Sequence, residues 1–150
     1  RQMCIRDRSD SIDSLKSFLG VKRRMEKISE INEIKIYDDF AHHPTAIRLS
    51  SQALRNKHPN RKILGIIELG SNTMSSGYHK ENLLDSFESI NEALVLDPKG
   101  IYQGDNIFQS ISVLLEELIK IIKDYDIILI MTNKDSQKFI QPILESLEEK

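Results

Sequence analysis

The sequence contains a single cysteine in 150 residues and no tryptophan. One cysteine cannot form an internal disulfide bond, and it excludes a zinc site built from several thiolates. Long apolar runs are also missing: the longest, such as residues 127–131, are far shorter than the roughly 20 residues that cross a bilayer. No basic segment followed by an apolar one marks a secretory signal. We therefore expect a cytoplasmic protein that is not inserted in a membrane.

A large excess of charge of one sign is missing as well. The chain has 21 Lys and Arg against 23 Asp and Glu, and the two signs are interspersed. This balance gives no bulk attraction to nucleic acid or to an anionic membrane, so we expect neither as a partner. With 39% hydrophobic residues, a chain of this length can bury one core. We expect one domain in which binding is confined to a local site.

The first eight residues, RQMCIRDR, resemble the translation of a sequencing adapter. We therefore exclude residues 1–8 from fold reasoning and assign residues 9–150 to the domain. We also expect this domain to be part of a longer protein.

Alternating strand and helix patterns predict an α/β, Rossmann-like domain, with a mostly parallel sheet, helices on both faces and a β-hairpin at its entry. The expected strands are residues 25–30 and 34–38 in the hairpin, then 62–68, 93–96 and 126–131. The expected helices are residues 11–19, 44–57, 79–90, 106–123 and 135–148. In the helix after Pro44, we expect Ile47, Leu49 and Leu54 to face the core.

Polar residues follow the carboxyl ends of four predicted strands. In a sheet of this kind, the ligand crevice lies outside those ends. The segments concerned are residues 38–43, 68–74, 97–100 and 132–135. We therefore expect one edge of the sheet to carry the site, and we assign His58, His79 and Tyr102 to the surface.

The densest of these segments is DDFAHHPTAI at residues 38–47, at a strand-to-helix junction. Pro44 suits the first residue of a helix, whose free N–H groups favour a phosphorylated ligand. The residues alone leave a second interpretation open, in which Asp38 caps local N–H groups and one histidine is an ordinary helix-start residue.

The same cluster has the residue types of a metal-dependent phosphohydrolase, because Asp and His both bind divalent cations. A zinc site needs three or four converging ligands, however, and the adjacent His42 and His43 generally point in different directions. We therefore expect no metal ligand here and keep the hydrolase as an alternative. A non-catalytic α/β interaction module is another alternative, which the polar edge disfavours.

Three segments together resemble the C-terminal domain of the Mur ligases: GVKRR at residues 20–24, YDDFAHHPTAI at residues 37–47 and SNTM at residues 71–74. The resemblance extends over residues 9–150 and is strongest to the murein peptide ligases. It implies an ATP-dependent ligase that joins L-alanyl-γ-D-glutamyl-meso-diaminopimelate to UDP-N-acetylmuramate in peptidoglycan recycling. The UDP-N-acetylmuramate–L-alanine ligases carry a close variant of the second segment and are the alternative within the family.

The resemblance further implies a three-domain enzyme, in which an acyl phosphate forms and is attacked by the amine of the incoming peptide. ATP and Mg²⁺ would be held mainly by the central domain, and the N-terminal and central domains would be partners of this one. No GxxxxGK[ST] phosphate-binding loop occurs in the chain. We therefore expect the domain to be inactive by itself.

Roles for the arginines and the acid–histidine cluster follow from the resemblance. Arg23 or Arg24 would bind the γ-phosphate or the acyl phosphate, since a guanidinium donates paired hydrogen bonds to phosphoryl oxygens. Without the resemblance, a solvated basic turn would be preferred. The nucleotide-binding residues would lie in the second segment, with Asp39 on the ribose and a histidine against the nucleoside: Asp38, Asp39, His42 and His43.

The resemblance places the incoming peptide on the loops after the later strands. Ser71, Asn72, Thr73 and Asp97 offer hydrogen-bonding groups there, although such loops are usually ordinary polar connections. Murein peptide ligases usually have an arginine where this chain has Gly70, which puts the identity of the accepted peptide in question. Lys80 or Lys99 could supply the missing cation.

Overall fold

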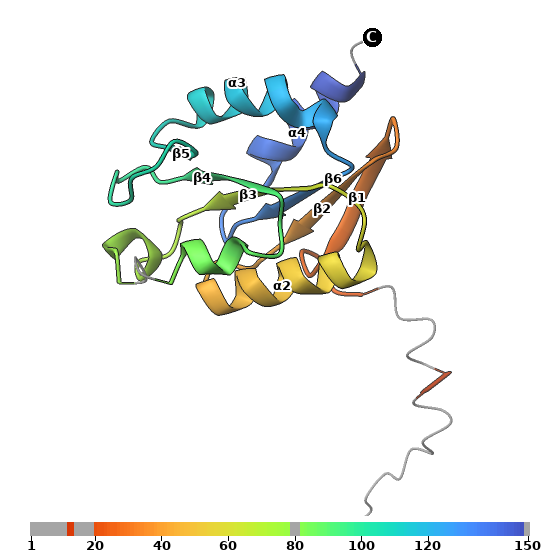
Figure 1. Ribbon diagram of the computed structural model, residues 1–150, viewed down its shortest axis with the longest axis horizontal. Helices are drawn as coiled ribbons and strands as arrows, with labels where there is room; N and C mark the ends of the chain where they lie inside the picture. Colours follow the sequence, from red (N-terminus) through yellow and green to blue (C-terminus); the bar gives the residue numbers. More distant parts are fainter. Residues whose placement is uncertain (1–11, 14–19, 79–81, 149–150) are drawn as a thin grey trace, which may run out of the picture.

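The computed structural model describes residues 12–13, 20–78 and 82–148, and these form one sheet covered by helices on both faces (Figure 1). The strand order is β1-β2-β6-β3-β4-β5. β1 and β2 are antiparallel, and the other neighbouring strands are parallel. The mostly parallel sheet with an entry hairpin is therefore confirmed. The helix expected over residues 11–19 lies outside the described residues except at positions 12 and 13.

The strands are short and most were expected. Their bounds are β1 Glu26–Ile31, β2 Ile34–Asp39, β3 Ile63–Glu68, β4 Glu92–Leu96, β5 Ile107–Phe108 and β6 Ile127–Met131. The helices are α2 Pro44–Lys57, α3 Ile111–Ile121 and α4 Gln137–Glu148, with the 3₁₀ helices η1 Met74–Ser76, η2 Leu84–Phe87 and η3 Ile122–Asp124. Across the described ranges, no helix has the length and apolar character needed to cross a bilayer.

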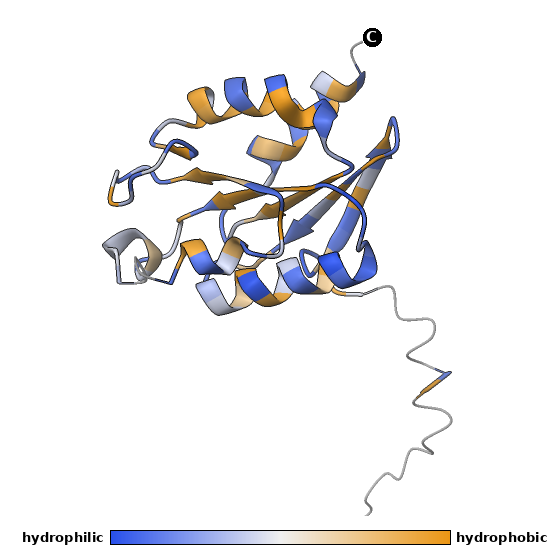
Figure 2. Cartoon of the chain, viewed as in Figure 1, coloured by the Kyte–Doolittle hydropathy of each residue, from blue (hydrophilic) through white to orange (hydrophobic). Residues whose placement is uncertain are grey.

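The sheet separates two hydrophobic cores because alternate residues of a strand face opposite sides. In β6, Ile128 and Ile130 pack in the core beneath α3 and α4, whereas Leu129 and Met131 pack in the core above α2. All four side chains are fully buried. Figure 2 shows that the central strands β3, β4 and β6 are largely hydrophobic, whereas β1 and β2 are partly hydrophilic. Burial on both faces explains why β6 reads as an uninterrupted apolar run.

The hairpin between β1 and β2 closes with a two-residue turn. Asn32 and Glu33 both have positive φ angles, 51° and 67°, as a type I′ turn requires. Asn32 tolerates this conformation, and its side-chain amide also donates a hydrogen bond to the Leu147 carbonyl at 2.8 Å. Glu33 adopts the same conformation although it carries a β-carbon, so the turn carries local strain there.

Three sequence-based expectations were wrong. Leu49 is 54% exposed. It lies two positions after the buried Ile47, and residues two positions apart point to nearly opposite sides of a helix. The described part of the helix expected over residues 79–90 contains only η2, where the Ser86 hydroxyl bonds to the Leu83 carbonyl and competes with regular helical bonding. The helix expected from residue 106 begins at Ile111, because β5 first pairs with β4.

Candidate functional site

The carboxyl ends of β2, β6, β3 and β4 meet at one edge of the sheet, since their pairings are parallel. We define the rim as the loops that follow these ends, residues 40–43, 132–135, 69–73 and 97–100. The convergence of the predicted polar segments is therefore confirmed. Strands lie about 4.8 Å apart, so the loops after β2 and β3, two strands from each other, are roughly 10 Å apart.

Arg23 ties the entry of the hairpin to the rim. Its Nε donates to Asp38 Oδ2 at 3.1 Å, and its Nη2 donates to the Thr132 carbonyl at 2.6 Å. The backbone of Arg23 has a positive φ of 55°, and its N–H donates to the Glu26 carboxylate at 2.7 Å. The Arg23 guanidinium is thus engaged within the protein, where it braces β2 against β6.

Arg24 differs from its neighbour in that its side chain is exposed. Among the described residues, its guanidinium makes no hydrogen bond or ion pair, and its one recorded contact is with an aromatic ring. The guanidinium carbons of Arg23 and Arg24 lie 5.3 and 5.5 Å from the Phe40 ring centroid, within cation–π range. The structure therefore leaves Arg24 available to an anionic ligand and holds it near residue 40.

Asp38 is buried at the end of β2, with 2% exposure. Besides Arg23, its Oδ2 accepts a hydrogen bond from the Ser136 hydroxyl at 2.7 Å. Its Oδ1 has no partner among the described residues. A buried carboxylate is stable only when it is paired, so Asp38 depends on Arg23.

Asp39 shapes the loop that follows β2. Its Oδ2 accepts from the Met25 N–H at 2.7 Å, and its Oδ1 accepts from the Ala41 N–H at 2.8 Å and the Ser50 hydroxyl at 3.2 Å. The local capping role that the sequence left open for Asp38 is thus carried by its neighbour. A contact between Asp39 and a ribose stays a prediction, since the carboxylate is 4% exposed.

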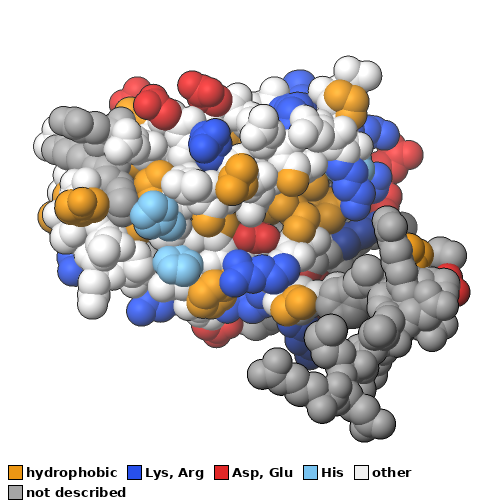
Figure 3. Space-filling view, turned by 90° about the horizontal axis from the view of Figure 1, so that it is seen from below, with side chains coloured by type: hydrophobic (Ala, Val, Ile, Leu, Met, Phe, Trp, Pro, Cys, Tyr) orange, Lys and Arg blue, Asp and Glu red, His pale blue; other side chains and the backbone are white. Residues whose placement is uncertain are grey.

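His42 and His43 occupy different environments at the start of α2. The half-buried His42 ring packs edge-on against Phe40, with centroids 5.2 Å apart. Its Nδ1 lies 2.8 Å from the Phe40 carbonyl, which only accepts, so Nδ1 carries the proton. His43 is exposed and precedes Pro44 as the N-cap residue. Figure 3 shows two histidine side chains beside each other on this face, with Lys and Arg side chains nearby.

A metal centre is not supported by the described part of the chain. Within it, no group of three His, Cys, Asp or Glu side chains is placed to hold a metal ion. The oxygens of Asp38 and Asp39 are committed to Arg23, hydroxyls and backbone N–H groups, apart from Asp38 Oδ1. This geometry argues against the metal-dependent phosphohydrolase.

A second polar network on the rim was missed from the sequence. Glu68, 6% exposed at the end of β3, accepts from the Thr132 hydroxyl at 2.6 Å and pairs with Lys138 Nζ at 2.5 Å. Since the Thr132 carbonyl accepts from Arg23, polar contacts run continuously from β2 through β6 to β3. The sequence did hold one sign of this network: Glu68 ends a buried apolar strand, and a buried carboxylate requires a partner such as a cation.

The loop after β3 presents polar groups to solvent. Asn72 and Thr73 are exposed and Ser71 is half-buried. The Ser71 hydroxyl lies 3.3 Å from Thr73 Oγ1 and accepts from the Met74 N–H at 3.3 Å. The loop is therefore folded on itself, while its amide and hydroxyl groups remain accessible to a ligand.

Asp97 supports that loop from beneath. It is completely buried, and its two oxygens accept from the Lys99 N–H at 3.3 Å and the Tyr102 N–H at 2.8 Å. Tyr102 is 6% exposed and donates its hydroxyl to the Met74 carbonyl at 3.0 Å, so its surface assignment was wrong. Burial raises the pKa of Tyr102, which keeps the hydroxyl protonated as a donor. A direct contact of Asp97 with substrate stays a prediction.

Of the two histidines assigned to the surface, only His58 lies within the described residues. His58 is half-buried, 3.3 Å from the Tyr37 hydroxyl, and burial lowers its pKa. His79 and Lys80 lie outside the described residues.

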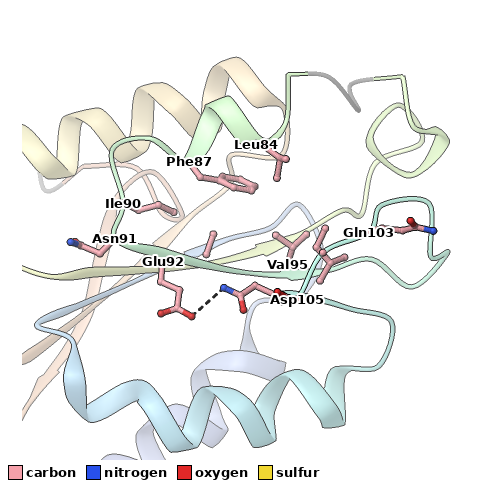
Figure 4. A pocket seen from close by; sticks show the side chains of 12 residues that line it. Leu84, Phe87, Ile90, Asn91, Glu92, Val95, Gln103 and Asp105 are labelled. Carbon is pink, nitrogen blue, oxygen red and sulfur yellow. Dashed lines mark hydrogen bonds between the residues drawn. The ribbon is translucent and has the colours of Figure 1, made fainter.

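A cavity of about 540 Å³ lies on the outer side of β4, away from the rim (Figure 4). Phe87, Ile90 and Val95 form much of its apolar wall. At its mouth, Glu92 accepts a hydrogen bond from the Asn106 amide at 3.1 Å. None of the predicted site residues lines this cavity, so the rim remains the candidate site.

Comparisons with known sequences support the resemblance to the Mur ligases. Residues 23–134 match the family described as Mur ligase, glutamate ligase domain. The chain is 32% identical over 154 aligned positions to the UDP-N-acetylmuramate–L-alanyl-γ-D-glutamyl-meso-2,6-diaminoheptandioate ligase of Escherichia coli, covering 95% of this chain and 34% of that protein. It is 46% identical over 83 positions to a UDP-N-acetylmuramate–L-alanine ligase of Streptococcus equi subsp. zooepidemicus, covering 54% of this chain and 17% of that protein.

A solved structure supports the fold as well. The crystal structure of a murein peptide ligase from Psychrobacter arcticus superposes with a TM-score of 0.76 at 31% identity, covering 92% of this chain and 32% of that one. The present chain thus spans about a third of the length of these relatives.

Proposed function

This chain belongs to the Mur ligase family, and from that premise we propose that it is the last domain of an ATP-dependent ligase acting on UDP-N-acetylmuramate and a murein tripeptide. The tripeptide is L-alanyl-γ-D-glutamyl-meso-diaminopimelate. The similarity to the Escherichia coli enzyme along 95% of the chain supports this choice within the family. We place the reaction in the cytoplasm, where ATP and UDP-linked sugars are found.

One observation carries the proposal: the loops after β2 and β3 share the rim, and the Arg24 guanidinium lies against Phe40 of the first loop. The two loops are roughly 10 Å apart, since two strand spacings separate them. A nucleotide phosphate and a peptide amine that react with the same carbonyl group must lie within such a distance. The rim therefore has the dimensions to close over both.

In the proposed reaction, a carboxylate oxygen of UDP-N-acetylmuramate attacks the γ-phosphorus of ATP and ADP leaves. The peptide amine then attacks the acyl carbon, and phosphate leaves as the amide bond forms. Arg24 would donate hydrogen bonds to the transferred phosphoryl oxygens and stabilise their charge. Arg23 would act as a positioning residue, because its guanidinium is already bonded to Asp38 and Thr132.

The loop after β2 is proposed to contact the nucleoside. His42 offers a ring fixed by its bond to the Phe40 carbonyl, and His43 is exposed beside it. Asp39 would act mainly by holding this loop, and Asp38 by holding Arg23. On the other side, Ser71, Asn72 and Thr73 would bind the peptide, with Asp97 supporting them through Tyr102.

Catalysis requires more than this chain. The sequence contains no phosphate-binding loop of the GxxxxGK[ST] type. We propose that a central domain holds ATP, with Mg²⁺ neutralising its phosphates, and that an N-terminal domain completes the site. The isolated chain should therefore bind these ligands weakly and should not turn over.

The test is acceptor choice by the complete ligase that contains this domain. ADP formation is followed with ATP, Mg²⁺ and UDP-N-acetylmuramate, and with either the tripeptide or L-alanine as acceptor. The proposal predicts that the tripeptide gives a kcat/KM at least about tenfold higher. A preference for L-alanine would instead identify the alternative that the Streptococcus equi match favours. Turnover with neither acceptor would refute both.

A further inference from the structure

We propose that Lys134 supplies the rim cation that binds a carboxylate of the incoming peptide, at the place where an arginine at position 70 would otherwise supply it. This inference rests on the proposed function, because it takes an acidic peptide as the acceptor. It also makes Lys134 a specificity-determining residue of this particular chain. The residue follows β6, directly beside the loop that begins at Gly70.

The packing around Gly70 admits a side chain only if its neighbours move. A β-carbon at this position would lie 2.6 Å from Asn133 Oδ1, 2.9 Å from Lys134 Cγ and 3.1 Å from Lys134 Cε. Distances below 3.0 Å are repulsive, so a larger residue would have to displace both neighbours. The alkyl chain of Lys134 therefore occupies the space into which a side chain at position 70 would extend.

The position of Lys134 is fixed from its backbone. Its N–H donates to the Thr132 hydroxyl at 3.0 Å, and that hydroxyl donates to Glu68. With Cγ and Cε both lying over Gly70, the side chain follows the loop after β3. The ammonium nitrogen, one bond beyond Cε, is thus beside that loop.

The ammonium group of Lys134 is available to a ligand. Its side chain is exposed, and no described residue forms a hydrogen bond or ion pair with Nζ. Two cations close to the rim are already paired: Lys138 with Glu68 and Arg23 with Asp38. Lys134 is therefore an unneutralised charge next to the proposed peptide loop.

A carboxylate is the ligand that this arrangement suits. A carboxylate accepts several hydrogen bonds and is bound most strongly when one donor is charged. Lys134 offers the charged donor, and the exposed Asn72 amide and Thr73 hydroxyl of the loop after β3 offer neutral ones. The phosphate side of the rim has its own exposed cation in Arg24. The two charges can thus serve two different anionic groups.

The test uses the complete ligase with three variants. Lys134→Gln removes the charge, and Lys62→Gln is the matched control, because Lys62 is an exposed lysine that precedes β3 at the opposite edge of the sheet. The third variant, Gly70→Arg with Lys134→Gly, restores an arginine and removes the alkyl chain that blocks it. Of the three atoms nearest to a β-carbon at position 70, the Asn133 side-chain oxygen is the one that must still move. Steady-state KM values are measured for the tripeptide and for ATP.

We expect Lys134→Gln to raise the KM for the tripeptide by about tenfold, the loss of one charge-assisted hydrogen bond, and to leave the KM for ATP within about twofold. Lys62→Gln should change neither value. The paired variant should return the peptide KM to within about threefold of wild type. An unchanged peptide KM in Lys134→Gln, an equal effect of Lys62→Gln, or a rise in the KM for ATP instead would overturn the proposal.

A second acceptor identifies the carboxylate. The tripeptide with L-lysine as its third residue lacks one carboxylate of the diaminopimelate tripeptide. If Lys134 binds that group, the wild-type preference for the diaminopimelate peptide shrinks towards equality in Lys134→Gln. If Lys134 binds a carboxylate that both peptides share, both KM values rise equally. Absence of tripeptide turnover in the wild type would instead count against the proposed function itself.

Discussion

Replacement of Arg23 by methionine should destabilise the domain strongly, although the residue lies at the surface entry of the hairpin. The change keeps the side-chain length but removes the pair with Asp38 and the hydrogen bond to the Thr132 carbonyl. The side chain of Asp38 is only 3% exposed and would keep a single partner, the Ser136 hydroxyl. A buried carboxylate would thus lose its countercharge.

The magnitude follows from the exposure of the two partners. Removing one member of a buried pair costs roughly 3–5 kcal/mol, and removing one from a surface pair costs about 0–1 kcal/mol. Arg23 is 29% exposed and Asp38 is buried, so we expect a loss of about 2–3 kcal/mol in the free energy of unfolding. For a domain of this size, that lowers Tm by roughly 5–12 °C.

The assay is thermal and urea unfolding of the chain, followed by circular dichroism at pH 7. Arg24→Met is the matched control, because Arg24 is exposed and its recorded contact is with the Phe40 ring. A cation–π contact at an exposed site contributes about 0.5–1 kcal/mol, so the control should lower Tm by less than about 4 °C. Equal shifts in the two variants, or a shift below about 2 °C for Arg23→Met, would refute this reasoning.

Two further predictions concern stability. Glu33→Gly should stabilise the chain by about 1 kcal/mol in urea unfolding, because glycine adopts the positive φ of the hairpin turn without the strain of a side chain; a lower urea midpoint would contradict the assigned turn. Burial, aided by the hydrogen bond to Glu92, raises the pKa of Tyr125 above its ordinary value of 10.0. The stability from this shift is present below pH 10 and is lost as the pH rises further, so Tyr125→Phe should flatten the fall of Tm above pH 10; an unchanged slope would count against it.

Much of the fold follows from local patterns. The runs that became β3 and β6 are apolar throughout, as strands buried on both faces must be, and the proline of α2 marks its first turn. Because these strands are parallel, their polar ends had to share an edge. The rim could therefore be predicted without any knowledge of individual contacts.

Tertiary contacts determined what the sequence could not predict. β5 forms because Ile107 and Phe108 pair with β4. Two residues are too few for their own propensities to indicate such a strand. Lys138 is 70 positions from Glu68, so their pair has no local signal. Arg23 and Arg24 have the same chemistry, and what separates them is that Arg23 reaches Asp38 and the Thr132 carbonyl, which lie 15 and 109 positions away, whereas Arg24 is exposed. Sequence alone therefore left open which arginine serves a ligand.

The central claim is that Arg24, which lies against Phe40 of the rim, binds the phosphoryl group that is transferred from ATP. The most direct test is the rate of tripeptide ligation by the complete ligase carrying Arg24→Gln. Arg61→Gln serves as a control, because Arg61 precedes β3 at the opposite edge of the sheet. We predict that Arg24→Gln lowers kcat by about 100-fold or more and lowers Tm by less than about 4 °C, while the control keeps wild-type turnover. Turnover of Arg24→Gln within about threefold of wild type would contradict the account.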